Sequence, residues 1–289
     1  MGRANTGTSR FARRRRKGLL LALGTAAALA ASAPIAAAAG SGPSDVITQP
    51  VVGATWAGYD SIAASTPASA AQTYFTSVTG SFAAPALRCD PAAPARASVW
   101  VGLGGVLSTR AVYGPLQVGI DADCHHGRAS YLAWYEAYPE PLQPVRLAVA
   151  AGDMLTATVS IDPAGRPRVV LSDTTTGDSM AKTLAGVRVK PLATDSAEWI
   201  VEGPASQQAL ANFGSVTFSN ATATESSAAT VHSGPIDDPA WDYSEPDVIG
   251  LQGGGVHQSD VAASAAPGPL GPAGNSFTVS YGAGASFDQ

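Results

Sequence analysis

PLQVGID (residues 115–121) and SAEWIVE (residues 196–202) are two short stretches in which apolar side chains occupy every second position. Because successive side chains of a β-strand point to opposite faces, this pattern predicts two strands, each with an apolar face for a core. The opposite faces carry Gln117, Gly119 and Asp121 in the first stretch and Glu198, Ile200 and Glu202 in the second. We therefore expect an amide and a carboxylate to project from an otherwise apolar sheet.

The rest of the chain from Trp56 onward has the same character. Short runs rich in Val, Thr, Tyr, Trp and Phe alternate with turn signals such as DPAG (residues 162–165) and TTTG (residues 174–177). This spacing predicts an all-β fold, an antiparallel β-sandwich of the jelly-roll or concanavalin-like kind. Helical periodicity is nearly absent, and at most SQQALANF (residues 206–213) could form a short helix. NSFTVSYG (residues 275–282) is typical of a closing strand.

The N-terminus predicts export. Arginines and a lysine up to Lys17 precede an apolar, alanine-rich run that ends among small residues, so residues 1–39 are interpreted as a signal peptide. A signal anchor that stays in the bilayer is the alternative. Residues 40–55 are then a flexible leader or short propeptide, and residues 56–289 one domain. Within it, residues 226–255 have little apolar periodicity and are interpreted as an irregular excursion rather than a strand pair.

The charge balance makes some partners improbable. Seven of the 17 Lys and Arg lie in residues 1–39, which contain none of the 22 Asp and Glu, so the exported protein carries about −12. Such a surface disfavours nucleic acid, and no segment after the signal predicts membrane insertion. With few cations, little charge pairing is lost when carboxylates are protonated, so we expect a fold that tolerates acid.

Cys89 and Cys124 are the only cysteines of the chain. In an exported protein they are expected to form a disulfide, with two free thiols as the alternative.

Two further strands add groups to the polar sheet face. SYLAWYEAYP (residues 130–139) places Trp134, Glu136 and Tyr138 on one face, and SVWVGLGG (residues 98–105) does the same for Trp100, Gly102 and Gly104. A sheet face with tryptophans, glycines, an amide and carboxylates is typical of a groove floor, where glycines leave room for a bound polymer.

These motifs together resemble a known family. WAGY at Trp56, SVWVGLGG, LQVGID, AWYEAYP, AEWIVE and NFGSVTFSNATAT occur in the same order in the eqolisins, which are glutamic peptidases. The resemblance extends from Trp56 to about Thr224. It implies a β-sandwich whose concave face holds the active site, and a secreted peptidase, taken here to act as a monomer on polypeptides in acid without a metal or cofactor.

The resemblance also implies roles for single residues. Gln117 and Glu202 match the catalytic pair, with Glu202 as the general base that activates water and Gln117 as the donor to the oxyanion. The residues matching the family's substrate cleft are Trp56, Trp100, Trp134, Glu136 and Tyr138. Gly104 and Leu132 stand where the fungal members have aspartates, and Gly203 and Pro204 replace an acidic-aromatic continuation. These departures affect the subsites and the pH optimum more than the chemistry.

Other interpretations remain open from the sequence. Gln117 and Glu202 could be ordinary strand residues, and the aromatic residues could be sandwich packing. A jelly-roll glycan hydrolase with Glu136 and Glu202 as paired carboxylates is one alternative function, and a non-catalytic polymer-binding module is another. DADCHHG (residues 121–127) could suggest a metal site, but a hairpin turn is the preferred interpretation.

Overall fold

The computed structural model describes residues 51–53, 55–64, 73–105, 115–189, 194–204, 208–227, 230–241, 247–251 and 265–282. Within these ranges every helix or strand assigned is a β-strand, which agrees with the all-β prediction. None of the described segments is a helix long and apolar enough to cross a membrane. The predicted signal peptide and most of the leader lie outside the described residues.

The strands of the first half are β1 (Val51–Gly53), β2 (Trp56–Ile62), β3 (Tyr74–Ala83), β4 (Ala95–Leu103), β5 (Leu116–His125), β6 (Arg128–Ala137), β7 (Gln143–Pro144) and β8 (Met154–Ile161). Those of the second half are β9 (Pro167–Asp173), β10 (Ser179–Thr183), β11 (Ser196–Glu202), β12 (Ala209–Leu210), β13 (Ser215–Ser226), β14 (Val231–Pro235), β15 (Asp247–Leu251), β16 (Ala265–Pro267) and β17 (Phe277–Tyr281).

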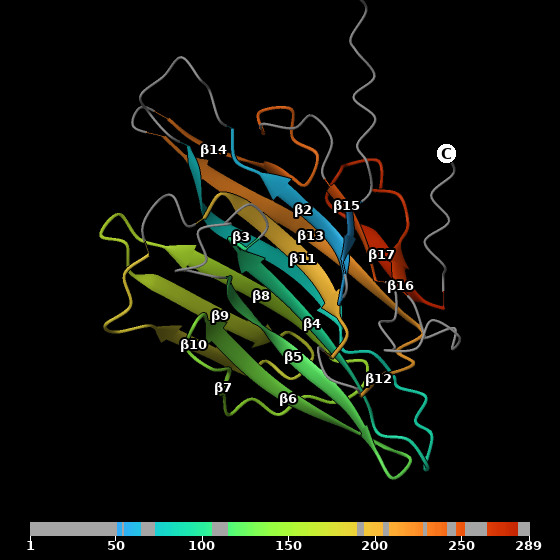
Figure 1. Cartoon of the computed structure of the whole chain (residues 1–289). Helices are drawn as coiled ribbons and strands as arrows, with labels where there is room; N and C mark the ends of the chain where they lie inside the picture. Colours follow the sequence, from blue (N-terminus) through green and yellow to red (C-terminus); the bar gives the residue numbers. More distant parts are fainter. Residues whose placement is uncertain are drawn as a thin grey trace, which may run out of the picture. The chain divides into compact units, whose positions relative to one another are not determined.

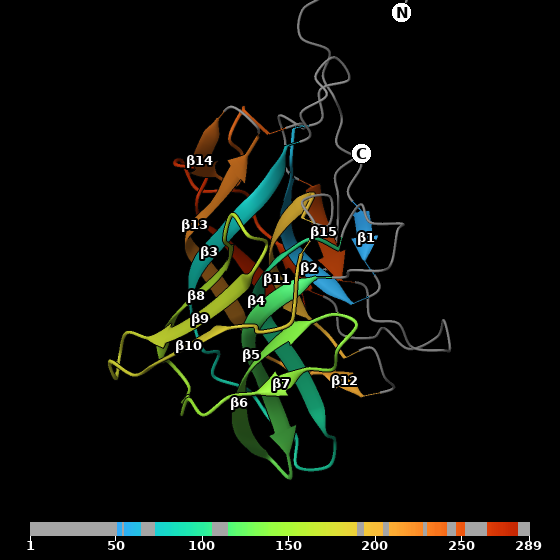
Figure 2. The same cartoon turned by 90° about the vertical axis from the view of Figure 1, so that its left-hand side faces the viewer.

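Hydrogen-bonded pairing divides these strands into two layers (Figures 1 and 2). One layer has the order β7–β6–β5–β4–β11–β2–β15, and its neighbours pair antiparallel. The other has the order β10–β9–β8–β3–β13, with β14 and β17 also paired to β13. Strand β16 joins β15 to β17 and so links the layers at one edge. Parallel pairing occurs at β1–β15 and β12–β4.

The core lies between these layers and follows the predicted alternation. Val118 of β5 and Trp199 of β11 are fully buried in one hydrophobic cluster that also contains Phe82 of β3 and Leu171 of β9. The indole Nε1 of Trp199 donates to the backbone oxygen of Thr79 on β3 at 2.7 Å, so this side chain crosses to the second layer. The apolar faces of PLQVGID and SAEWIVE therefore face inward, and Gln117 and Glu202 lie on the other face.

Three segments differ from the expectations. Part of the leader forms β1, which pairs with β15. The stretch 226–255, expected to be irregular, contributes β14 and β15, which pair with β13 and β2. Within residues 206–213, Ala209–Leu210 form the short strand β12, and none of the described residues of this stretch is helical. In each case a neighbouring strand supplies hydrogen bonds that a weak local pattern does not reveal.

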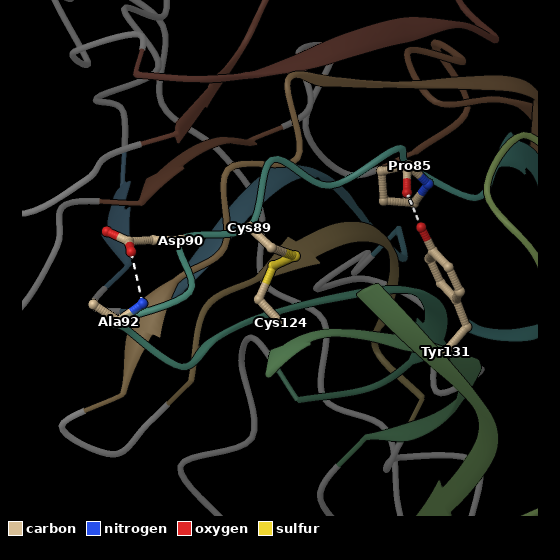
Figure 3. Close-up of a disulfide and its surroundings, with 6 residues drawn as sticks. All are labelled: Pro85, Cys89, Asp90, Ala92, Cys124 and Tyr131. Atoms are coloured by element: carbon tan, nitrogen blue, oxygen red, sulfur yellow. Dashed lines mark hydrogen bonds between the residues drawn. A yellow bond between two sulfur atoms is a disulfide. The ribbon is translucent and has the colours of Figure 1, made fainter. Parts of the chain in front are cut away.

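The predicted disulfide is present. Cys89, in the loop after β3, is bonded to Cys124 near the end of β5, and both described cysteines are thereby paired (Figure 3). Beside it, the hydroxyl of Tyr131 donates to the backbone oxygen of Pro85 at 2.6 Å, which fastens the same loop to β6.

Candidate active site

Cross-strand pairing brings the candidate residues together in three rows on the outer face of the first layer. Side chains directly opposite in neighbouring strands lie on the same face, with Cβ atoms about 4.5–5.5 Å apart. In the order β6, β5, β4, β11, β2, the rows are Glu136–Gln117–Gly102–Glu198–Asp60, then Trp134–Gly119–Trp100–Ile200–Gly58, then Leu132–Asp121–Ser98–Glu202–Trp56.

Gln117 is held by its neighbour in the first row. Its side chain is buried, and Nε2 donates to Oε2 of Glu136 at 2.7 Å. Burial raises the pKa of Glu136, and the hydrogen bond from Gln117 acts in the opposite direction. The amide has two N–H groups, so one remains after this bond for another acceptor.

Glu202 is the last residue of β11 and lies opposite both Ser98 and Trp56. Its Oε2 accepts a hydrogen bond from Nε1 of Trp100 at 2.9 Å. Burial raises the pKa of Glu202 to about 6, against the hydrogen bonds from Trp56 and Trp100, which favour the ionised form. The charges of Glu136 and Asp121 raise it further. A carboxylate with this pKa is a competent general base in weakly acidic solution.

Trp100 forms the centre of a small apolar cluster on this face. Trp100, Trp134 and Ile200 are almost completely buried there, and Trp56 and Leu142 pack against them. The rings of Trp56 and Trp100 meet edge to face, with centroids 5.0 Å apart. This packing fixes the position of the Trp100 ring, and the Nε1–H of that ring in turn orients the carboxyl of Glu202.

The glycines of this face have a different role from the one expected. A methyl group at Gly102 would lie 2.9 Å from Cζ3 of Trp100, and one at Gly119 would meet the backbone oxygen of Val99 and the Cα and Cβ of Trp100 on β4. The space beside Gly102 is thus taken by the Trp100 ring and the Glu198 carboxyl, and Gly119 allows close approach of the β4 backbone, so neither position leaves room for a bound polymer. The interpretation of open room above the glycines is wrong for these two positions.

Asp121 is a site residue to which the sequence analysis gave no role in the chemistry. It is buried, and its Oδ1 accepts from the Ser98 hydroxyl at 2.6 Å and from Nε1 of Trp134 at 2.9 Å. Arg96 lies 3.5 Å from its Oδ2. Burial raises the pKa of Asp121, while Ser98, Arg96 and Trp134 lower it. The place of Asp121 on the same strand face as Gln117 and Gly119 was visible in PLQVGID, but its partners were not.

Tyr138 lies apart from the other candidates. It follows the end of β6, is 48% exposed, and lines a cavity of about 340 Å³ together with Leu103 and Leu116. These two leucines belong to the row that faces the core, so the cavity is on the other side of the sheet from Gln117.

DADCHHG forms the hairpin between β5 and β6 that the sequence predicted. His125 pairs with Arg128, and the two residues between them, His126 and Gly127, both have positive φ, as a tight two-residue turn requires. Arg96 binds Asp123 through Nε at 2.7 Å, and both histidines are exposed at the turn. Within the described ranges, no group of three or more acidic, histidine or cysteine side chains has a metal-binding arrangement.

Comparisons with known proteins agree with this architecture. The model of the peptidase A4 family matches residues 54–240. Aspergillopepsin-2 of Aspergillus niger is 37% identical over 153 residues, which are 52% of this chain and 52% of that protein. Scytalidopepsin B of Scytalidium lignicola is 29% identical over 109 residues, covering 37% of this chain and 40% of that protein. The chain therefore spans about half, or less, of the length of these curated relatives.

Two solved structures show the same fold. Scytalido-glutamic peptidase with a transition state analog inhibitor aligns with a TM-score of 0.57 at 21% identity, covering 80% of this chain and all of that one. Aspergilloglutamic peptidase from Aspergillus niger aligns with a TM-score of 0.50 at 31% identity, covering 65% of this chain and 99% of that one.

Proposed function

This chain belongs to the peptidase A4 family, and from that premise we propose that it is a glutamic endopeptidase whose general base is Glu202 and whose oxyanion donor is Gln117. One observation carries the proposal: Trp100 holds a half-buried carboxyl, with a pKa raised to about 6, on the same sheet face as an amide that keeps a free N–H. The names of the relatives, which are peptidases, support the substrate class.

The chemistry follows from these two groups. Ionised Glu202 takes a proton from water while the water oxygen forms a bond to the scissile carbonyl carbon. The second N–H of Gln117 donates to the carbonyl oxygen as negative charge develops there, a contribution of about 3–4 kcal/mol for one such donor. Glu202 then gives its proton to the nitrogen, the C–N bond breaks, and a carboxylic acid and an amine leave. Each step uses only water and the peptide.

The pKa of Glu202 places the activity in weak acid. A base with a pKa of about 6 is mostly protonated in strong acid, so kcat/KM should rise with pH towards that value. At higher pH, kcat/KM should fall again because neighbouring buried carboxyls lose their protons. We propose export from the cell and action as a monomer on polypeptides, in line with the N-terminal sequence and the acidic composition.

The test is digestion of an unfolded protein across about pH 3 to pH 8, comparing the wild type with Glu202→Gln. We expect the substitution to lower kcat by at least about 100-fold, the lower end of what a general base contributes. Asp178→Asn is the matched control, because Asp178 is an exposed carboxylate in the turn between β9 and β10. Retained turnover in Glu202→Gln would remove Glu202 from the mechanism. Release of reducing sugar from glycans, without peptide cleavage, would instead favour a glycan hydrolase.

A further inference from the structure

Glu198 is a buried carboxyl group that the mechanism above does not use. It is fully buried on β11, and neither of its carboxyl oxygens has a hydrogen-bond partner among the described residues. In the first row it lies opposite Gly102, which in turn lies opposite Gln117.

The missing side chain of Gly102 lets Glu198 reach towards Gln117. A methyl group at residue 102 would be 3.1 Å from Oε2 of Glu198, so this carboxyl lies beside the glycine, on the side of β11 that faces β4 and Gln117. Gly102 is the one residue between Glu198 and Gln117 in this row, and the edge of the Trp100 ring lies beside the same position, 2.9 Å from where that methyl group would be.

The side-chain oxygen of Gln117 lacks a hydrogen-bond donor among the described residues. Its Nε2 donates to Glu136, but Oε1 is buried and no donor of the described residues reaches it. A buried acceptor without a donor costs about 1–3 kcal/mol. It also leaves the orientation of the amide fixed from one end only.

The surroundings of Glu198 keep it in the protonated form. Burial raises its pKa well above the ordinary value, and the charges of Asp60 and Asp195 raise it further, while the hydroxyl of Ser196 has the opposite effect. Asp60 lies directly opposite on β2, and Asp195 precedes β11. A neutral carboxylic acid carries one O–H donor.

We propose that Glu198 is a positioning residue that donates its O–H to Oε1 of Gln117, directly or through one water molecule, and thereby directs the free N–H of the amide at the substrate carbonyl. The inference rests on the proposed function, because only there is Gln117 the oxyanion donor. The two glutamates of AEWIVE then have separate roles: Glu202 works as an anion, and Glu198 works only while it holds its proton. Enzymes commonly assign different roles to two carboxyl groups whose environments give them different pKa values.

Two substitutions separate positioning from packing. Glu198→Leu keeps the volume and removes the donor, whereas Glu198→Gln keeps an N–H donor that cannot ionise. We expect Glu198→Leu to lower kcat about 10- to 100-fold, a part of the 100- to 1,000-fold that loss of an oxyanion donor costs, with KM changed less than about twofold. Glu198→Gln should retain kcat within about fivefold and keep its activity to higher pH than the wild type.

A double-mutant cycle gives the decisive result. If Glu198 acts through Gln117, adding Glu198→Leu to Gln117→Ala should change kcat less than about twofold. An undiminished loss in that background, or unchanged kcat in Glu198→Leu alone, would overturn the inference. If Glu198→Leu does not fold, an upper pH limb in Glu198→Gln identical to that of the wild type would do so. Failure of the wild type to cleave any peptide would instead refute the proposed function itself.

Discussion

The stability of this protein should fall as the pH rises, because the sheet face that carries Gln117 and Glu202 buries carboxyls with raised pKa values. Folded Glu202 holds its proton up to about pH 6, whereas an unfolded glutamate releases it near 4.5. Between these values the folded state binds more protons, so a rising pH favours unfolding. The difference of 1.5 pKa units corresponds to about 2 kcal/mol. This stabilisation is complete below 4.5 and is lost as the pH passes 6.

Urea unfolding at about pH 3.5 and about pH 7.5, by fluorescence or circular dichroism, measures this loss. We expect the wild type to lose about 2 kcal/mol between the two conditions through Glu202. The raised pKa values of Glu136, Asp121 and Glu198 add to this loss, and the lowered pKa values of Asp162 and Asp173 act against it. Glu202→Gln, which cannot titrate, should lose about 2 kcal/mol less than the wild type over the same range. An equal loss in both proteins, or a stability that rises with pH, would refute the reasoning.

Three further predictions concern single contacts. Trp100→Phe removes the N–H that donates to Glu202; because that bond favours the carboxylate, the acid limb of kcat/KM should move up by about one pH unit, and an unmoved limb would contradict this role. Replacing Cys89 and Cys124 by serine opens a loop with a sequence separation of 35 and should cost about 3–4 kcal/mol in urea unfolding, whereas a loss below about 1 kcal/mol would show that the bond adds little. Phe218→Ala removes a ring stacked on Phe277 in the core and should cost about 3–5 kcal/mol in the same assay; a near-neutral result would contradict the packing.

The sequence predicted correctly on which sheet face the candidate residues lie, where strands are central and one face is buried. In PLQVGID and SAEWIVE the apolar residues must face the core. Because side chains alternate between the two faces of a strand, this alone determines the face on which Gln117 and Glu202 lie. The hairpin at His126 and the disulfide could also be predicted from the sequence. A tight turn depends on a few adjacent residues, and two cysteines allow only one intramolecular pairing.

The pairing of the remaining strands and the side-chain contacts around the candidate residues do not follow from the alternation of side chains along a strand. Strands β14 and β15 have weak local patterns and owe their pairing to β13 and β2. The space beside Gly102 was predicted to be open, but the ring of Trp100, two residues earlier on the same strand, and the carboxyl of Glu198 occupy it. The partners of Asp121 come from two other strands, so its role depends on register and side-chain conformation.

The proposal that Gln117 and Glu202 act on one reacting carbon is tested most directly by a crystal structure with a peptide-based transition-state analogue that carries two hydroxyl groups on a tetrahedral carbon. We expect one hydroxyl to lie about 2.7–3.1 Å from Nε2 of Gln117 and the other at a similar distance from the carboxyl of Glu202. An analogue bound with its tetrahedral carbon out of reach of either group would contradict the shared role of this amide and this acid.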